Sequence, residues 1–236
     1  MIKGSISSIE TMGLVDGPGI RYVVFLQGCK LRCLFCHNPE TWKMEDKLLM
    51  TPDELIRKVL KYKNYYGEEG GLTFSGGEPL LQPEFLLECL RLAKTCNLHT
   101  ALDTAGVGFG DYEEILKYTD LVILDIKAID EEGFKKMTGS TMKEFHHFLD
   151  VCIKMQKPLW LRQVIVPGIN DTEDYILKLK QYIKQIPNVE KVELLPYHEL
   201  GKEKYHDLKI PYPLENTKAM DPTRLQELQA LLKSKD

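Results

Sequence analysis

The chain has 236 residues, 43% of them hydrophobic, and a formal net charge of -4 with an isoelectric point near 5.9. This length is enough to bury one large core, so we expect a single domain over residues 1–236. The acidic balance argues against a nucleic-acid binder, which usually carries a basic face. No apolar run is long enough to span a membrane.

Short apolar runs alternate with amphipathic stretches along the chain, which is typical of a parallel sheet covered by helices. The expected strands are Arg21–Gln27, Gly71–Phe74, Leu98–Leu102, Leu121–Leu124, Leu159–Val166 and Lys191–Leu195. The expected helices are one that follows the N-cap residue Thr51, then Pro83–Cys96, Thr141–Met155, Thr172–Ile186 and Pro222–Lys233. The pattern predicts an α/β fold.

Polar and glycine-rich residues follow the carboxyl end of each expected strand. They include the cysteine loop from Gly28, the turn Ser75–Pro79, the pair Asp103-Thr104, the segment Asp125–Lys127 and the loop with His198. In parallel α/β barrels these loops share one face, where active sites lie. Six strands close only partway, so we predict a partial (β/α)6 barrel with a lateral opening and an active site at the C-terminal strand ends.

The most informative feature is the cysteine loop, which carries Cys29, Cys33 and Cys36 in a C-x₃-C-x₂-C spacing. A [4Fe-4S] cluster normally takes four thiolates, so three would leave one iron open to bind another molecule. With His37 the loop also forms a Cys₃His set for zinc, but zinc sites usually pair C-x₂-C with two distant ligands.

The other three cysteines, Cys89, Cys96 and Cys152, lie in apolar helical segments and are interpreted as core residues. The first residues lack the apolar region of a secretion signal, and three of the six cysteines are too close together to link distant segments. We therefore expect free thiols and a cytoplasmic protein.

Three segments together resemble a known family: Val15–Arg21, Cys36–Trp42 and Leu195–Gly201. They are similar to the radical S-adenosylmethionine (SAM) enzymes that activate glycyl-radical enzymes, of the pyruvate formate-lyase type. The resemblance runs from about Ile6 to Gly201 and thins beyond it. The cysteine-rich insert that many relatives carry after the first motif is absent.

This resemblance implies an anaerobic reaction in which a [4Fe-4S] cluster donates one electron to SAM. SAM then yields methionine and a 5′-deoxyadenosyl radical, which removes a hydrogen atom from one glycine of the partner. It implies pyruvate formate-lyase as protein substrate and a one-electron donor such as flavodoxin or ferredoxin. We expect a monomer that binds neither nucleic acid nor a membrane.

The resemblance also assigns roles to individual residues. Cys29, Cys33 and Cys36 would hold the cluster, and Asp103, Thr104 and Asp125 a monovalent cation. The residues that would contact SAM are Phe35, Cys36, His37, Gly77, Asp125, Ile126, Lys127, Arg162 and His198. Asp16 is the candidate for contact with the partner's glycine loop.

Several of these residues have an ordinary structural interpretation as well. Asp125 and Lys127 point to the same face of a strand and can form a simple salt bridge. Arg162 can belong to a structural ion pair, and Asp16 can be an Asx-turn residue. The Ser75–Pro79 segment can be an ordinary turn, His198 a packed loop residue, and His146-His147 a surface pair.

Two other functions stay open at this stage. One is a radical SAM enzyme that acts on a small molecule or on a different glycyl-radical enzyme. The other is a non-catalytic module that binds zinc or an iron–sulfur cluster.

Overall fold

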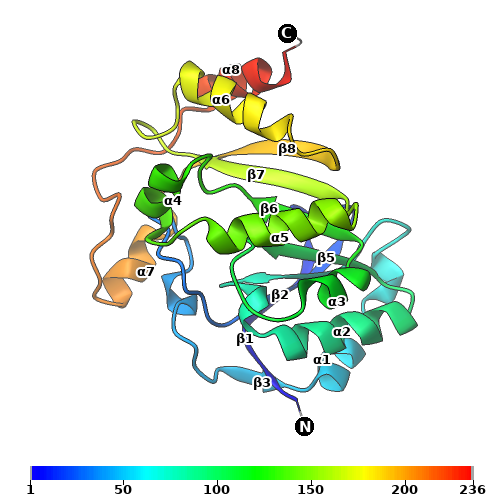
Figure 1. The fold of residues 1–236 in the computed structure, drawn as a ribbon. Coiled ribbons are helices and arrows are strands. Elements are labelled where there is room, and N and C mark those ends of the chain that lie inside the picture. Colours follow the sequence, from blue (N-terminus) through cyan, green and yellow to red (C-terminus); the bar gives the residue numbers. More distant parts are fainter. Residues whose placement is uncertain (1, 235–236) are drawn as a thin grey trace.

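The computed structural model describes residues 2–234 and contains one eight-stranded sheet in the order β3-β1-β2-β4-β5-β6-β7-β8 (Figure 1). Six strands run parallel to one another, and all six were predicted from the sequence. Their bounds are β2 Arg21–Leu26, β4 Gly71–Gly76, β5 His99–Thr104, β6 Leu121–Asp125, β7 Leu159–Ile165 and β8 Val189–Pro196.

Two strands were not predicted, and both are antiparallel to their neighbours. β1 (Gly4–Gly13) pairs with β2, and the three-residue β3 (Leu48–Met50) pairs with β1. The six predicted strands are parallel as expected, and these two antiparallel strands extend the sheet at one end. β1 alternates half-buried and exposed residues over much of its length, so its sequence lacks the apolar run by which the other strands were found.

The helices lie outside the sheet (Figure 1). Five match the predicted ones: α1 Pro52–Leu60, α2 Pro83–Thr95, α5 Lys143–Lys154, α6 Glu173–Ile183 and α8 Pro222–Lys233. Thr51 caps α1 as expected, because its hydroxyl accepts from the Glu54 N–H while the Glu54 carboxylate accepts from the Thr51 N–H. Three short helices were missed, α3 Tyr112–Lys117, α4 Glu131–Thr138 and α7 Lys202–Asp207, together with the 3₁₀ turns Pro39–Thr41, Lys63–Tyr65 and Pro79–Leu81.

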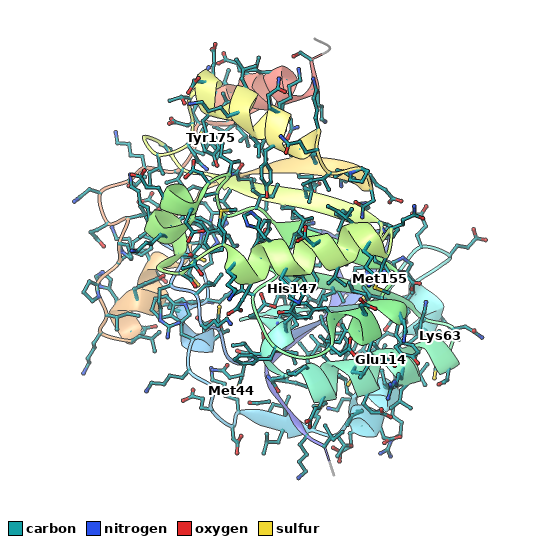
Figure 2. All side chains as sticks on the ribbon, in the orientation of Figure 1. Met44, Lys63, Glu114, His147, Met155 and Tyr175 are labelled. Carbon is teal, nitrogen blue, oxygen red and sulfur yellow. The ribbon has the colours of Figure 1, made fainter. Side chains whose placement is uncertain are left out.

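The main core fills the space between the outer face of the sheet and the helices. Leu72 and Phe74 of β4 belong to it and are fully buried, as strand alternation requires. Cys89 and Cys152 are also fully buried, whereas Cys96 is only half-buried. Figure 2 shows His147 on α5, where it lies beside Tyr112, and both His146 and His147 are exposed.

The inner face of the sheet carries the opposite set of side chains. Ala101, Leu121 and Ile123 form a small apolar cluster there, with Trp160 packed against it. β3 and β8 are the two edges of the sheet, so it remains open and forms the partial barrel that six short strands predicted. Within residues 2–234, the helices are all too short or too polar to cross a membrane.

Candidate functional site

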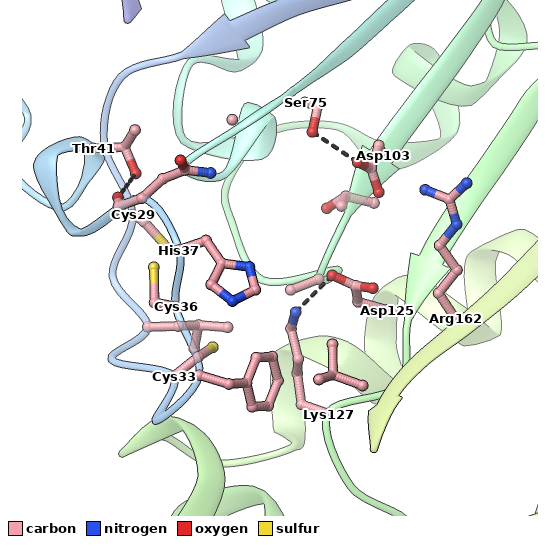
Figure 3. Close-up of a pocket in the computed structure, with 18 of the residues that line it drawn as sticks. Cys29, Cys33, Cys36, His37, Thr41, Ser75, Asp103, Asp125, Lys127 and Arg162 are labelled. Carbon is pink, nitrogen blue, oxygen red and sulfur yellow. Dashed lines mark hydrogen bonds and ion pairs between the residues drawn. The ribbon is translucent and has the colours of Figure 1, made fainter. Parts of the chain in front are cut away.

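A cavity of about 230 Å³ lies on the inner side of the sheet, at the carboxyl ends of the parallel strands. One wall is the cysteine loop, and the opposite wall consists of residues from β4, β5, β6 and β7 (Figure 3). The predicted site residues that line it are Cys29, Cys33, Phe35, Cys36, His37, Gly77, Asp103, Thr104, Asp125, Lys127 and Arg162. Cys29 and Arg162, 133 residues apart in sequence, thus line one cavity, as the strand-end argument predicted.

Hydrogen bonds to its main chain from three parts of the sequence fix the cysteine loop. The Gly28 N–H donates to the Thr41 carbonyl at 2.8 Å, while Arg32 and Leu34 donate to the carbonyls of Thr138 and Met137 at the end of α4. The Cys36 carbonyl accepts from the Tyr205 hydroxyl of α7 at 3.1 Å. The loop is therefore held in place by elements from both halves of the sequence.

Burial dominates the acid–base properties of the three thiols. It raises the pKa of Cys29 to about 12 and that of Cys33 to about 11. Burial also raises the pKa of Cys36, opposed by hydrogen bonds from the Asn38 backbone and the Trp42 side chain. These thiols are protonated at neutral pH, so binding iron would release protons from them.

The donor set suits an iron–sulfur cluster, because three soft sulfur ligands come from one loop and face one cavity (Figure 3). Over the described residues, no three histidine, cysteine or acidic side chains are placed to hold a single metal ion. His37, the fourth ligand of the zinc alternative, instead places its Nε2 2.9 Å from the His198 carbonyl.

Two glycines let the turn after β4 pack closely against the cysteine loop. A Cβ on Gly77 would lie 2.2 Å from the carbonyl oxygen of Gly28, where the cysteine loop begins. Gly76 has a φ of 113°, a conformation that favours glycine, and its Cβ would meet the backbone of Leu26. The two glycines thus let the turn after β4 pack directly on the loop and on β2.

Glu78 is the buried centre of this turn. Its Oε1 accepts from the Leu80 N–H at 3.0 Å and from the Thr104 hydroxyl at 2.6 Å, and its Oε2 accepts from the Ala105 N–H at 2.9 Å. Burial raises the pKa of Glu78 to about 7, although these three donors oppose the shift. The carboxyl group therefore ties the end of β5 to the turn that follows β4.

Charged side chains gather on the strand side of the cavity. The Lys127 ammonium lies 2.6 Å from the Asp125 carboxylate and 5.3 Å from the centre of the Phe35 ring. Burial alone would lower the pKa of Lys127, but the nearby Asp125 and Cys33 outweigh it and raise the pKa. The predicted salt bridge is present, and both of its members line the cavity (Figure 3).

Asp103 and Arg162 complete this charged wall. Asp103 accepts a hydrogen bond from the Ser75 hydroxyl at 2.7 Å. Burial, followed by the charge of Asp125, raises the pKa of Asp103 to about 6. Arg162 forms the structural ion pair considered above, with 3.1 Å between its Nε and the Glu193 carboxylate, and also donates to the Val15 carbonyl.

Thr104 lines the cavity beside Asp103, but its hydroxyl is already engaged. It donates to Glu78 and accepts from the Gly106 N–H at 2.9 Å. The Asp125 carboxylate also has a partner already, the Lys127 ammonium. A cation held by Asp103, Thr104 and Asp125 stays a prediction.

Three predicted site residues do not line the cavity. Ile126 is buried outside the cavity lining, and its N–H donates to the Arg162 carbonyl at 2.7 Å. His198 stacks on His37 with ring centres 3.9 Å apart, and its buried Nδ1 has no hydrogen-bond partner within residues 2–234. Asp16 is half-buried beside Arg162, and burial raises its pKa.

Sequence reasoning missed two aromatic residues of the site. Trp42 lines the cavity; it ends the Cys36–Trp42 segment that carries the family resemblance, but it was not named as a site residue. Tyr205 lies 169 residues from Cys36 and is fully buried behind the loop, edge-on to Trp42 with ring centres 5.8 Å apart. No local pattern links a residue so far along the chain to the cysteines.

Comparison with known proteins gives a consistent picture. The Radical SAM superfamily matches residues 23–179. The pyruvate formate-lyase-activating enzyme of Clostridium pasteurianum is 53% identical over 99% of this chain and 98% of its own length. That of Staphylococcus epidermidis is 44% identical over 96% and 94%. These matches continue past Gly201, where the resemblance seen in the motifs had thinned.

Solved structures share the fold. A domain of a pyruvate-formate lyase-activating enzyme from Bacteroides vulgatus gives a TM-score of 0.56 at 23% identity, over 69% of this chain and 92% of that one. A radical SAM methyltransferase from Sphaerobacter thermophilus gives 0.65 at 13% identity, over 90% and 63%.

Proposed function

Because this chain belongs to the radical SAM superfamily, and within it to the pyruvate formate-lyase-activating enzymes, we propose that it activates pyruvate formate-lyase by creating a glycyl radical on it. The enzyme uses a [4Fe-4S] cluster and SAM as cofactors. The observation that carries the proposal is the convergence of three thiols, two glycines and four charged side chains on one cavity.

In this proposal Cys29, Cys33 and Cys36 hold the cluster and leave one iron open. When bound, the cluster supplies an electron, and SAM supplies the 5′-deoxyadenosyl radical that takes hydrogen from the partner's glycine. The residues of the chain bind and orient these groups and keep water from them.

The charged wall suits the polar end of SAM. Lys127 and Arg162 offer positive charge to a carboxylate, while Asp103 and Asp125 accept hydrogen bonds from an amino group or from hydroxyls. Phe35 and His37 line the cavity, where their rings can contact the adenine, and His198 stacks on His37. The Gly77 backbone can approach a ligand closely because it has no side chain.

The cysteine assignment is tested by iron and sulfide analysis after anaerobic reconstitution. The wild-type protein should hold about four irons and four sulfides per chain, as a cubane requires. Replacing Cys29, Cys33 or Cys36 with Ala should abolish the cluster, whereas Cys96→Ala should not. Stoichiometric zinc, with cluster assembly unaffected in Cys33→Ala, would contradict the assignment.

The function itself is tested with purified pyruvate formate-lyase, SAM and a chemical reductant under anaerobic conditions. The expected result is an electron paramagnetic resonance doublet from a glycyl radical on the partner. If SAM is cleaved but no doublet appears on pyruvate formate-lyase, the partner is wrong and another glycyl-radical enzyme becomes the candidate. The cytoplasmic location, the monomeric state and the electron donor stay predictions.

A further inference from the structure

The buried guanidinium of Arg21 is hydrogen-bonded by uncharged groups. Arg21 begins β2 and is fully buried, and among residues 2–234 it forms no ion pair with a carboxylate. Burial lowers its pKa to about 10, so it is still charged at neutral pH. An apolar side chain would fill this space at lower cost than a buried charge without a counter-ion. Packing alone therefore does not explain an arginine here. Its hydrogen-bond partners are the Thr73 hydroxyl at 2.9 Å, the carbonyls of Leu72, Glu69, Pro18 and His99 at 2.7, 3.2, 3.4 and 3.4 Å, and the His99 Nδ1 at 3.1 Å.

These hydrogen bonds continue to the turn formed by residues 15–18, which we call the Asp16 turn. The Thr73 hydroxyl accepts from the Arg21 Nε and donates to the Asp16 carbonyl at 2.8 Å. The Arg21 Nη1 donates directly to the Pro18 carbonyl. Thr73 is therefore a bridge between the buried cation and the backbone of the turn.

Two further contacts fix the same turn. Arg162 of β7 donates to the Val15 carbonyl. Gly17 has a φ of 134°, a conformation that favours glycine, and a Cβ there would lie 3.2 Å from the Arg21 Nε. The backbone of the Asp16 turn is thus held by side chains of β2, β4 and β7, and it packs directly on the guanidinium.

The Asp16 carboxylate is the part of the turn that these bonds leave free. It is partly exposed, and no group within residues 2–234 donates a hydrogen bond to it. It cannot form an Asx turn, because the residue two positions on is Pro18, which has no N–H. After burial and Asp125, the charge of Asp16 also contributes to the raised pKa of Asp103, which lines the cavity. An unpaired acceptor on a fixed backbone beside the cavity suits the N–H groups of an incoming main chain.

We propose that Thr73 and Arg21 are positioning residues for the protein substrate. They hold the Asp16 turn by its backbone, so that the Asp16 carboxylate accepts hydrogen bonds from the main chain of the partner's glycine loop. Thr73 itself lies outside the cavity lining, two residues before Ser75, and touches neither cofactor nor substrate. The inference rests on the proposed function, because it requires a partner with a target glycine.

The test measures glycyl-radical formation on whole pyruvate formate-lyase and, separately, SAM cleavage to 5′-deoxyadenosine without the partner. Thr73→Val keeps the shape of the side chain and removes its hydroxyl, whereas Thr73→Ser keeps the hydroxyl. Thr100→Val is the matched control. Thr100 is also fully buried in a strand and donates to the Tyr118 carbonyl at 2.7 Å, but it pairs with Leu72 on the outer face of the sheet.

At saturating partner, Thr73→Val should form the glycyl radical about tenfold more slowly than wild type, because small misplacements of a reacting group are costly. Iron content and SAM cleavage without the partner should not change. Thr73→Ser should recover most of the rate. Thr100→Val should activate the partner like wild type, even if urea unfolds it more easily.

A double substitution locates the effect at Asp16. Asp16→Ala with Thr73→Val should be no slower than Asp16→Ala alone, since the position of the turn matters only while its carboxylate binds the partner. Calorimetry on the cluster-free protein gives a measurement that does not depend on activity. A peptide that carries the target glycine should bind Thr73→Val more weakly than wild type. If Thr73→Val does not fold, Arg21→Met replaces the buried charge with an apolar chain and carries the same expectations.

The proposal is overturned if Thr73→Val activates the partner as fast as wild type, if Thr73→Ser stays as slow as Thr73→Val, or if the slowing multiplies with that of Asp16→Ala. It is also overturned if SAM cleavage without the partner slows in parallel, because Thr73 would then act on the cofactor site. These outcomes leave the proposed function intact as long as wild type produces the radical doublet. If wild type cleaves SAM but gives no doublet on pyruvate formate-lyase, the proposed function and this inference fail together.

Discussion

Lys127 faces two acidic side chains and the sulfur of Cys33 from the strand side of the cavity. Replacing it with Ala leaves the Asp125 carboxylate without its partner and removes a cation that suits the carboxylate of SAM. We expect SAM affinity to fall about tenfold or more, the usual cost of an unpaired charged hydrogen-bonding group.

Titration of SAM onto the anaerobic, oxidised protein measures this loss. Lys154→Ala is the matched control, because Lys154 pairs with Glu113 on the exposed side of α5. Asp125→Ala should weaken binding too. If Lys127→Ala and Asp125→Ala both bind SAM like wild type, the charged wall is not the cofactor site.

Substitution of the buried Glu78 should lower the stability of the fold. Glu78→Ala leaves two backbone N–H groups and the Thr104 hydroxyl unpaired in the core, so the free energy of unfolding should fall by about 3 kcal/mol. Glu78→Gln should cost less, because its side-chain oxygen still accepts from Leu80 and Thr104. Urea unfolding of the cluster-free protein measures both, with Glu68→Ala in an exposed loop as control.

The Glu78 carboxyl group should also make the free energy of unfolding depend on pH. The folded-state pKa of Glu78 is raised from 4.5 to about 7, so the folded protein binds more protons than the unfolded chain across that window. Stability from this group is therefore lost as pH rises from 4.5 to 7. The advantage of wild type over Glu78→Gln should shrink over this range, and an advantage that grows would show that Glu78 is ionised throughout.

The turn after β4 and the cysteine loop behave as one packed unit. If Gly77 only contacts SAM, as the resemblance implies, a side chain there should obstruct SAM and spare the cluster. In the structure a Cβ there would meet the carbonyl oxygen of Gly28 at 2.2 Å. We therefore expect Gly77→Ala to lower iron content as well as SAM binding.

Iron and sulfide analysis after reconstitution distinguishes the two expectations. Gly168→Ala controls for backbone strain without a clash, because Gly168 has a φ of 75° and a Cβ there would touch nothing within 4 Å. A Gly77→Ala protein with a full cluster and weakened SAM binding would show that Gly77 serves SAM binding alone and that its packing on the cysteine loop does not affect the cluster.

The parallel strands were predictable because each is a short apolar run that ends in a polar residue. The sequence also placed Ser75, Asp103 and Asp125 together, since strand ends of one sheet share an edge. β1 escaped prediction because one side of it faces solvent, and β3 because it has only three residues. Tyr205 and Glu78 depend on contacts between distant segments, which no local pattern encodes.

At the scale of the whole molecule, the open sheet decides how a protein substrate can reach the cavity. In the proposed function the target glycine comes within contact of the reacting atoms, so we predict that the partner's loop leaves its own fold and enters the opening. Asp16 lies beside Arg162, which lines the cavity, and its turn exposes the large apolar side chains Leu14 and Val15, at 72% and 74% of their surface. Arg162 holds this turn to the cavity wall.

A short peptide that carries the glycine should therefore be a usable but poor substrate, because it lacks the remote contacts that position the loop. Asp16→Asn should lower the glycyl-radical yield on the whole partner without changing cluster content or SAM binding. The measurement is the intensity of the electron paramagnetic resonance doublet of the glycyl radical on the peptide or the partner. A peptide that reacts as efficiently as the partner would show that docking outside the glycine loop contributes nothing.

The dependence of the cysteine loop on α7 has a consequence for the order of assembly during synthesis. The cysteines leave the ribosome early, yet Tyr205, which holds the Cys36 carbonyl, and Lys204, which bonds Asn38 and Glu40, emerge only after all eight strands. A nascent chain has its three thiols long before it has the wall behind them. We expect iron to be inserted after translation, and a Tyr205→Phe chain to keep its sheet and hold less iron after reconstitution.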